Sequence, residues 1–316
     1  MTEGALSARI NDAPNDPIFG IVELYRADTR PHKINLAAGV YMDERGITPI
    51  LSSVHAAEER LLASVTTKLY VPIGGDPAYL RAAAALLFRR VGGAWGDLEP
   101  AATDRLQMIH TPGGTGAVRL AVDLIARLRP GAEIWVGEPT WPNHTQIVEA
   151  AGRVARRHDW ISEDARSLNT QSLFDAIAAA KGGDAMILHG ACHNPTGIDP
   201  TPEQWQEIAR EIAHRGIVPI LDFAYQGFGE GLVEDAASLR AFLATGCEVL
   251  VASSASKNFA LYNERVGALA IVGSDAASTA SIATHARLAV RTMWSNPPAH
   301  GGAIVATILG DAELRA

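Results

Sequence analysis

The sequence is poor in the features that mark secreted, membrane and nucleic-acid-binding proteins. It has only two cysteines in 316 residues, too few for a disulfide framework, so we expect a reducing compartment. No apolar run approaches the length of a membrane span, and the first residues lack the basic and apolar stretches of a signal peptide. Basic residues number 27 against 35 acidic ones, a net charge of −8, without a long basic run. These absences predict a cytoplasmic protein that binds neither membranes nor nucleic acids, and they leave small anionic ligands open.

The chain alternates short apolar segments with helical patterns. Hydrophobic residues make up 47% and charged residues 20% of the sequence, enough apolar material for a sizeable core. Segment 201–216 is typical of a helix, with Thr201 as the expected N-cap and Gly216 as the expected C-cap. The alternation predicts an α/β fold whose largely parallel sheet is covered by helices on both faces. Strands are expected at residues 106–110, 133–139, 184–190, 217–223, 247–254 and 266–273.

The first part of the chain has a different pattern. A short helical segment is followed by loop-like punctuation rather than by strands. We therefore interpret residues 1–48 as an arm together with the N-terminal part of a small domain, and residues 49–316 as a large domain that holds the sheet.

Polar residues follow the expected strands directly, where an open α/β sheet has its carboxyl edge. Ligands of such sheets bind at this edge. The glycine run 113–116 precedes a helix, so its backbone N–H groups are placed to bind a phosphate, although a plain tight turn explains the run equally well. Together the strands deliver several clusters to this edge: Gly113–Gly116, Thr140–His144, His193–Gly197, Asp222 with Tyr225, and Ser254 with Ser256 and Lys257.

Some of these residues have an ordinary structural explanation when taken alone. Trp141 suits stacking on a flat ring, but it suits a hydrophobic core as well, as does Tyr225. Asn194 fits the turn chemistry of its own NPTG segment. His189, Cys192 and His193 have a passing resemblance to a metal site, but they span a strand end and a loop and no convincing further ligands follow, so we predict no metal site.

Lys257 and Arg265 are the most informative residues. A lysine just past a strand end is ordinarily a solvated loop residue. An amine held among small residues near other cations instead has a lowered pKa and becomes a nucleophile towards carbonyls. Arg265 suits a phosphate dianion, and Asp222, at the end of an apolar strand, needs a partner or a cationic ligand. With a stacking Trp141, these are the groups that pyridoxal phosphate requires of a protein.

Several segments resemble, in order and spacing, the aspartate aminotransferases, a family of homodimeric fold type I pyridoxal-phosphate enzymes. The resemblance begins near Asp16 and continues to the last residue. It implies a mostly parallel, seven-stranded type of sheet, amino-acid and 2-oxo-acid substrates, and active sites shared across a homodimer. The segments that carry it are TPGGTGAVRLA, PTWPNH, HGACHNPTGIDPTPEQW, DFAYQGF, SSASKNFALYNERVGA and WSNPPAHG.

The resemblance implies a role for each matching residue. Lys257 would form the Schiff base with the cofactor and later carry the substrate proton, with Asp222 on the pyridine nitrogen and His144 behind Asp222. Tyr225 would be the third catalytic residue, and with Asn194 it would bind the phenolic oxygen. The remaining cofactor contacts would come from Trp141 on the ring and from Gly114, Thr115, Ser254, Ser256, Arg265 and the other subunit's Tyr70 on the phosphate.

The resemblance also bears on the substrate. Trp141 and Asn194 would contact it, Gly39 would lie in a segment that closes over it, and Arg291 would bind the side-chain carboxylate of a substrate in the other subunit. Arg291 therefore favours dicarboxylates, with aspartate and 2-oxoglutarate converted to oxaloacetate and glutamate. Aromatic-amino-acid aminotransferases of the same family can keep this arginine, so an aromatic substrate stays open.

A last expectation concerns the end of the chain. Members of the family normally continue beyond the matching region with most of the small domain and the arginine that binds the substrate α-carboxylate. We therefore expect the C-terminal small domain to be absent here. A truncated relative that binds the cofactor or dimerises without turnover is a third alternative.

Overall fold

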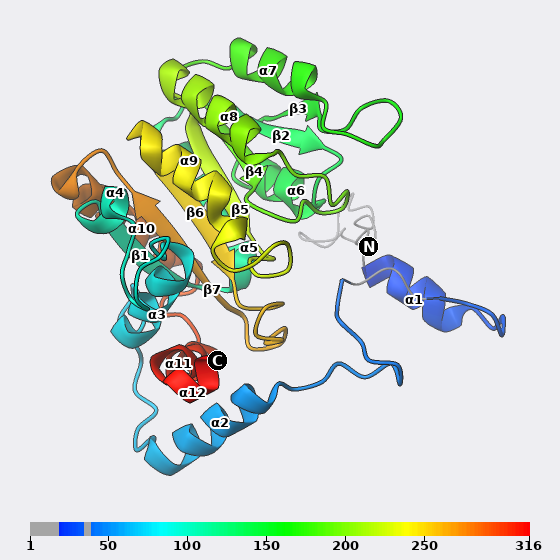
Figure 1. The fold of residues 1–316 in the computed structure, drawn as a ribbon, viewed down its shortest axis with the longest axis vertical. Helices are drawn as coiled ribbons and strands as arrows, with labels where there is room; N and C mark the ends of the chain where they lie inside the picture. Colours follow the sequence, from blue (N-terminus) through cyan, green and yellow to red (C-terminus); the bar gives the residue numbers. More distant parts are fainter. Residues whose placement is uncertain (1–18, 35–38) are drawn as a thin grey trace, which may run out of the picture. The chain divides into compact units, whose positions relative to one another are not determined.

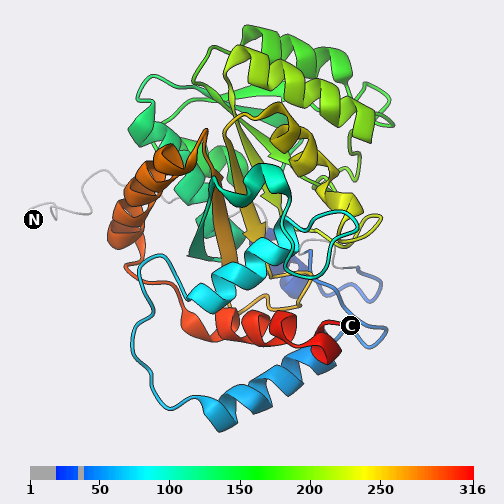
Figure 2. The ribbon, with the colours of Figure 1, turned by 60° about the vertical axis from the view of Figure 1, so that its left-hand side comes forward.

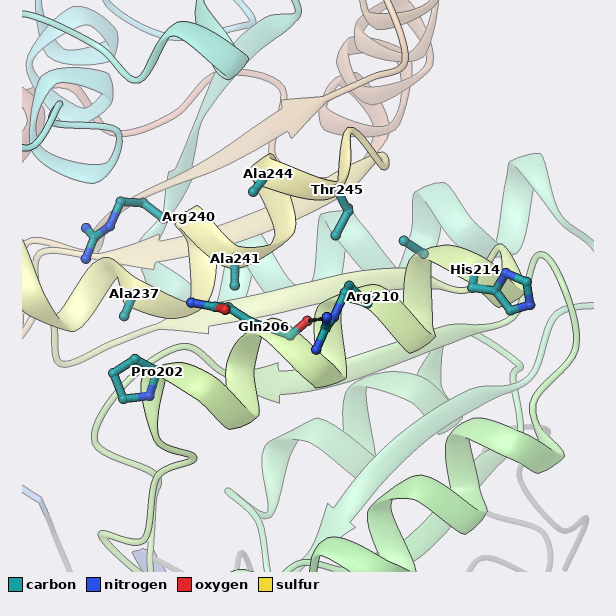
Figure 3. Close-up of a pocket in the computed structure, with 10 residues that line it drawn as sticks. Pro202, Gln206, Arg210, His214, Ala237, Arg240, Ala241, Ala244 and Thr245 are labelled. Carbon is teal, nitrogen blue, oxygen red and sulfur yellow. Dashed lines mark hydrogen bonds between the residues drawn. The ribbon is translucent and has the colours of Figure 1, made fainter.

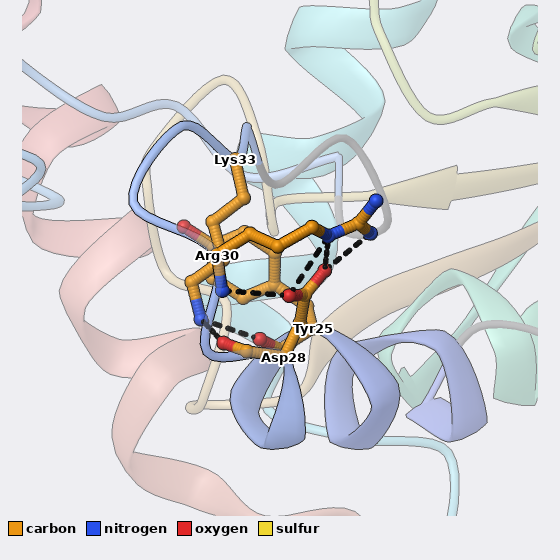
Figure 4. A network of polar contacts seen from close by, with 4 residues as sticks. All are labelled: Tyr25, Asp28, Arg30 and Lys33. Carbon is orange, nitrogen blue, oxygen red and sulfur yellow. Dashed lines mark hydrogen bonds and ion pairs between the residues drawn. The ribbon is translucent and has the colours of Figure 1, made fainter.

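The computed structural model describes residues 19–34 and 39–316, and the chain divides into two compact units, residues 1–48 and 49–316. The first unit contains helix α1 (Phe19–Ala27) and a turn closed by polar contacts (Figure 4). The Asp28 carboxylate accepts hydrogen bonds from the backbone and guanidinium of Arg30. Lys33 Nζ donates to the carbonyl oxygens of Tyr25 at 2.7 Å and Asp28 at 2.5 Å, so the chain folds back on the end of α1.

The second unit is built on a seven-stranded sheet with strand order β1-β7-β6-β5-β4-β2-β3 (Figure 1). β7 runs antiparallel to β1 and to β6, and the other neighbours are parallel. The prediction of an α/β fold with a mostly parallel sheet is confirmed. The strands are β1 (Leu106–Pro112), β2 (Ile134–Glu138), β3 (Ala155–Asp159), β4 (Ala185–His189), β5 (Val218–Phe223), β6 (Val249–Ser254) and β7 (Val266–Val272).

Strand β3 is absent from the strands expected from the sequence. Its residues read ARRHD, and only His158 among them is buried. β3 pairs with β2 alone and forms one edge of the sheet, where charged side chains are favoured because they oppose pairing with other chains. An edge strand of this kind lacks the apolar pattern by which the central strands are recognised.

Helices cover both faces of the sheet. Core residues of α7 (Thr170–Ala179), α8 (Pro202–Arg215) and α9 (Ala237–Thr245) pack on one face. Those of α5 (Gly113–Leu128), α6 (Asn143–Ala150) and α10 (Ala276–Met293) pack on the other. The central strands are therefore buried on both sides, as parallel sheets usually are.

The remaining helices include a smaller group around α11 at one end of the sheet, whereas the short α4 and η1 contact α9. Figure 2 shows α11 beside α2 and α3, and both contact it. None of the helices in the described part of the chain is long and apolar enough to cross a membrane. The bounds are α2 (Ser52–Ser64), α3 (Pro77–Leu87), α4 (Pro100–Thr103), the 3₁₀ helix η1 (Glu234–Ala236), α11 (Ala299–Gly310) and α12 (Ala312–Arg315).

Helix α8 shows how local sequence sets an element. Thr201 Oγ1 accepts from the Gln204 N–H, and Gln204 Oε1 accepts from the Thr201 N–H at 2.8 Å, a reciprocal capping box. Gly216 ends the helix with φ +65°, a left-handed conformation that costs glycine little. Both expected caps are confirmed.

Candidate active site

The carboxyl edge of the sheet gathers the predicted cofactor residues. Asp222 lies at the end of β5, and Ser254 ends β6 just before Lys257. Gly114 and Thr115 open α5 directly after β1. Because β7 runs antiparallel to β6, its amino end, next to Arg265, reaches the same edge. Strands far apart in sequence thus bring one set of polar side chains together.

Asp222 is buried, with its side chain 6% exposed, and it contacts a histidine whose side chain is 1% exposed. His144 Nε2 lies 3.0 Å from Asp222 Oδ2, and His144 Nδ1 lies 2.8 Å from Thr140 Oγ1. Thr140 Oγ1 lies in turn 3.0 Å from His189 Nε2. Burial, with smaller contributions from neighbouring histidines, lowers the pKa of His189 well below its usual value. The chain of contacts thus holds Asp222 as a buried acceptor directed towards the edge of the sheet.

Lys257 is the nucleophile candidate, and its surroundings favour the neutral amine. Burial lowers its pKa, the nearby Arg265 lowers it further, and Asp222 opposes both effects. Its Nζ lies 4.9 Å from the centroid of the Tyr225 ring. Burial and, second, the Asp222 charge raise the pKa of the Tyr225 phenol. A proton acceptor and a hydroxyl donor therefore lie side by side near one carboxylate.

The first turn of α5 and Arg265 form a cradle suited to an anion. α5 begins at Gly113 without a side-chain cap, so its first N–H groups are open to an anionic ligand. A Cβ atom at Gly113 would lie 2.4 Å from the Arg265 guanidinium, and one at Gly114 would lie 3.0 Å from Ser254 Cβ. Arg265 Nη1 donates to Ser256 Oγ at 3.3 Å. Gly113 also has φ +74°, so glycines at these two positions favour the close approach of helix, arginine and serines.

These features fit pyridoxal phosphate. The cradle at the start of α5 matches a phosphate dianion, the buried Asp222 matches a protonated ring nitrogen, and the Lys257 amine matches an aldehyde carbon. Trp141 is half-buried at the same edge, with its ring 5.3 Å from that of His144 in an edge-on arrangement. Asn194 is half-buried in the loop after β4, before a cis proline.

The remaining predicted residues lie elsewhere. Tyr70 is 90% exposed, and the exposed Arg291 donates through Nη1 to Ser295 Oγ at 2.7 Å. Gly39 is exposed and belongs to the first unit. Their roles in the binding of phosphate or substrate stay predictions.

Comparison with known proteins identifies the family. Residues 31–316 match the family model described as "Aminotransferase class I and II". The chain belongs to this family. It is 48% identical to an aspartate aminotransferase of Salmonella typhi, over 97% of this chain and 76% of that protein. It is 43% identical to an aromatic-amino-acid aminotransferase of Pseudomonas aeruginosa, over 98% of this chain and 75% of that protein.

Solved structures agree with this assignment. The aminotransferase chain superposes with a TM-score of 0.92 on the aromatic-amino-acid aminotransferase from Burkholderia pseudomallei, which is covalently bound to pyridoxal phosphate. The two are 38% identical, and the match covers 99% of this chain and 77% of that one. The fold of this chain is thus that of an aminotransferase.

The prediction from the sequence of this aminotransferase did not include two loop carboxylates near the site. Asp199 accepts from the backbone N–H groups of Cys192 at 2.6 Å and His193 at 2.8 Å, just before Asn194. Asp235 gathers the N–H groups of the loop after Tyr225. An aspartate in a loop is by itself weak evidence for such a role. The position of Asp235 directly after a glycine-rich loop, in the segment QGFGEGLVED, is a pattern that could have indicated this residue.

The histidines considered for metal binding lie close together in the aminotransferase. Within residues 19–34 and 39–316, no group of three or more His, Cys, Asp or Glu side chains is placed to hold a metal ion. The rings of His189 and His193 lie 4.1 Å apart, but Thr140 contacts His189 and Thr196 contacts His193. Both histidines thus have hydrogen-bonding partners inside the protein.

A groove of about 860 Å³ lies between α8 and α9, away from the predicted residues (Figure 3). Alanines form much of its lining, with Arg210 and Arg240 among the side chains drawn there. It contains none of the residues predicted for the cofactor. The candidate active site therefore rests on the clustering of titratable groups with shifted pKa values and not on this groove.

Proposed function

We propose that this chain binds pyridoxal phosphate and transfers the amino group of aspartate to 2-oxoglutarate, giving oxaloacetate and glutamate. The observation that carries the proposal is the partly buried Lys257 amine, whose pKa is lowered, beside Asp222 and Tyr225. The open start of α5 and Arg265 supply the matching anion site. The relatives named aspartate aminotransferase support the choice of substrate.

The residues at the edge of the sheet would divide the work of the reaction. Bound pyridoxal phosphate supplies an electron-withdrawing ring that eases loss of the substrate α-proton. Asp222 would keep a proton on the ring nitrogen, because a buried carboxylate is stabilised by a cationic partner. Lys257 would hold the aldehyde carbon and, once displaced by the substrate amine, accept the α-proton at Nζ and return it. Its lowered pKa supports this role, since only the neutral amine accepts a proton.

Other side chains would orient the reactants. Tyr225 and Asn194 would bind the phenolic oxygen of the cofactor, and Trp141 would stack on its ring. His144 and Thr140 would hold Asp222 in place through the contacts at 3.0 Å and 2.8 Å. The phosphate would bind to the first N–H groups of α5, including those of Gly114 and Thr115, and to Ser254, Ser256 and Arg265.

The proposal includes a homodimer with shared sites and a cytoplasmic location. Tyr70 and Arg291 are exposed, as expected of residues that reach a neighbouring subunit. Arg291 would bind the distal carboxylate of a substrate there, since its guanidinium matches a carboxylate with paired hydrogen bonds. Gly39 would lie in the segment that covers the substrate.

A borohydride experiment tests the cofactor assignment. Purified protein loaded with pyridoxal phosphate should absorb in the visible range, and reduction should fix the cofactor on Lys257, the half-buried amine with a lowered pKa. Peptide mass mapping gives the labelled residue, and Lys257→Ala is the control. Label on another lysine, or none, contradicts the proposal.

An aromatic-amino-acid aminotransferase is the second candidate. The relative of that name in Pseudomonas aeruginosa, at 43% identity, supports it. Arg291 does not separate the two activities, so kcat/KM for aspartate and for phenylalanine must be compared. We expect aspartate to be preferred, and replacement of Arg291 by Leu should reduce that preference. A clear preference of the unaltered protein for phenylalanine favours the second candidate, and turnover of neither substrate favours a non-catalytic relative.

A further inference from the structure

The carboxylate of Asp235 organises the loop that follows Tyr225. Asp235 lies in η1 and is 8% exposed. Its charge is met by backbone groups, since its two oxygens accept from successive N–H groups of one loop. The donors are Gly227 at 2.7 Å and Gly229 at 3.0 Å to Oδ2, and Glu230 at 2.8 Å and Gly231 at 3.4 Å to Oδ1.

The glycines of this loop allow its N–H groups to converge on the Asp235 carboxylate. Gly227 has φ +98° and Gly231 has φ +149°, conformations that L side chains rarely adopt. A Cβ atom at Gly229 would lie 2.5 Å from Asp235 Oδ1. The segment 227–231 is therefore shaped around an acceptor with two oxygens, and a neutral amide, which has one acceptor oxygen, cannot satisfy it.

The organised loop is joined directly to the backbone of Tyr225. The Phe228 N–H donates to the Tyr225 carbonyl oxygen at 3.0 Å. Gln226 Nε2 donates to the carbonyl oxygens of Leu232 at 2.8 Å and Leu86 at 3.3 Å, which ties the same loop to α3. The direction in which the Tyr225 side chain leaves the backbone is thus set by a turn that Asp235 closes.

We propose that Asp235 is a positioning residue, which acts through the backbone of Tyr225 to aim the phenol at the phenolic oxygen of the cofactor. This proposal rests on the proposed function, because Tyr225 matters for chemistry only if the cofactor binds. It adds a residue that touches neither cofactor nor substrate. A loose loop at this point would let the Tyr225 hydroxyl move, and misplacement of a catalytic group by about 1 Å can cost about 10²-fold in rate.

Cys192 provides a reporter for this loop that does not depend on the cofactor. Its Sγ lies 3.9 Å from the Tyr225 carbonyl oxygen. Burial first, then Asp235 and Asp199, raise the pKa of the thiol to about 11. Removal of the Asp235 charge or loosening of the loop should make the thiolate more available. Cys247, the other free cysteine, serves as an internal reference in the same molecule.

The experiment compares Asp235→Asn with the matched control Asp164→Asn. Asp164 also accepts loop hydrogen bonds, from Ser162 Oγ and the Arg166 N–H, but it lies in the connection between β3 and α7. In the cofactor-free protein, Asp235→Asn should speed alkylation of Cys192 relative to Cys247 by about threefold or more, and Asp164→Asn should not. Gly229→Ala, which presses a methyl group on the carboxylate, should act in the same direction and covers the case in which Asp235→Asn fails to fold.

The loaded protein tests whether the effect passes through Tyr225. The midpoint of the visible absorbance, titrated against pH, should move in Asp235→Asn in the same direction as in Tyr225→Phe, by about half a pH unit or more. In the Tyr225→Phe background, Asp235→Asn should add almost nothing, because coupled residues are not additive. An equal shift in both backgrounds, or none in either, overturns the proposal. If the unaltered protein does not absorb in the visible range after loading, the proposed function is overturned instead, and the link to Tyr225 with it.

Discussion

Individual backbone positions near Lys257 hold conformations that L-residues ordinarily avoid. Ala260 has φ +51° and Arg265 has φ +54°, in the left-handed region where Cβ crowds the following carbonyl oxygen. Arg265 is held there by hydrogen bonds from its Nη1 to Ser256 Oγ and to the Tyr262 carbonyl oxygen. Strain of this kind often collects at functional sites, where the surrounding structure maintains it.

Replacement of Ala260 by glycine should stabilise the protein. Glycine adopts φ +51° without the crowding of a Cβ atom, and this gain exceeds its greater entropy in the unfolded chain, so we expect about 0.5–1 kcal/mol more free energy of unfolding. Urea unfolding of the cofactor-free protein measures it. The control is Ala280→Gly on the exposed side of α10, which should instead lose about 1 kcal/mol. A loss in Ala260→Gly contradicts the strain argument.

Single residues also mark the limit of what the sequence could predict. The roles of Lys257 and Asp222 could be predicted because several polar clusters follow the expected strands together and their segments resemble one family. The contact between His144 and Asp222 spans 78 positions, and that between Thr140 and His189 spans 49. No local pattern reveals such pairs, because their geometry follows from the order of the strands.

At the scale of elements, strand order determines which segments meet. Parallel strands place the loops after β4, β5 and β6 at one edge, which the alternation of strands and helices could predict. Strand β3 and the antiparallel direction of β7 could not be predicted in this way. β3 is charged because it lies at the edge, and the apolar run of β7 looks the same in either direction.

The capping box of α8 gives a prediction at this scale. Thr201→Ala removes the acceptor for the Gln204 N–H and should lower the free energy of unfolding by about 1 kcal/mol. Chemical denaturation measures the loss, and Thr201→Ser, which keeps the hydroxyl, should lose much less. Because the cap lies at the start of a surface helix, the absorbance of bound cofactor should not change. Equal losses in both variants would show that the hydroxyl is not the stabilising group.

At the scale of the whole molecule, buried histidines link folding to pH. Burial lowers the pKa of His110, His158 and His193 to about 4. Each is neutral when folded and takes a proton in the unfolded chain below its ordinary value of about 6.5. The unfolded state therefore binds more protons between about pH 4 and 6.5, so stability rises with pH through this window and is complete above it.

Replacement of His158 by glutamine tests this linkage outside the active site. Each such histidine contributes a slope of about 1.4 kcal/mol per pH unit within the window. The plot of unfolding free energy against pH, from 4.5 to 6.5, should be less steep by about that amount in His158→Gln. His55→Gln, at an exposed position of α2, is the control for loss of a histidine as such. An unaltered slope in His158→Gln shows that His158 is not the group that titrates.

The hairpin between β6 and β7 has a consequence for the choice of ligand. Its strands pair antiparallel as far as Ser254 and Gly267, and the short connection between them contains both Lys257 and Arg265. This one connection would thus set the separation between the amine proposed to bind an aldehyde and the guanidinium proposed to bind a phosphate. The connection would therefore select ligands by length. A phosphate ester whose carbonyl carbon lies too near to its phosphate, or too far from it, would reach either Lys257 or Arg265, but not both.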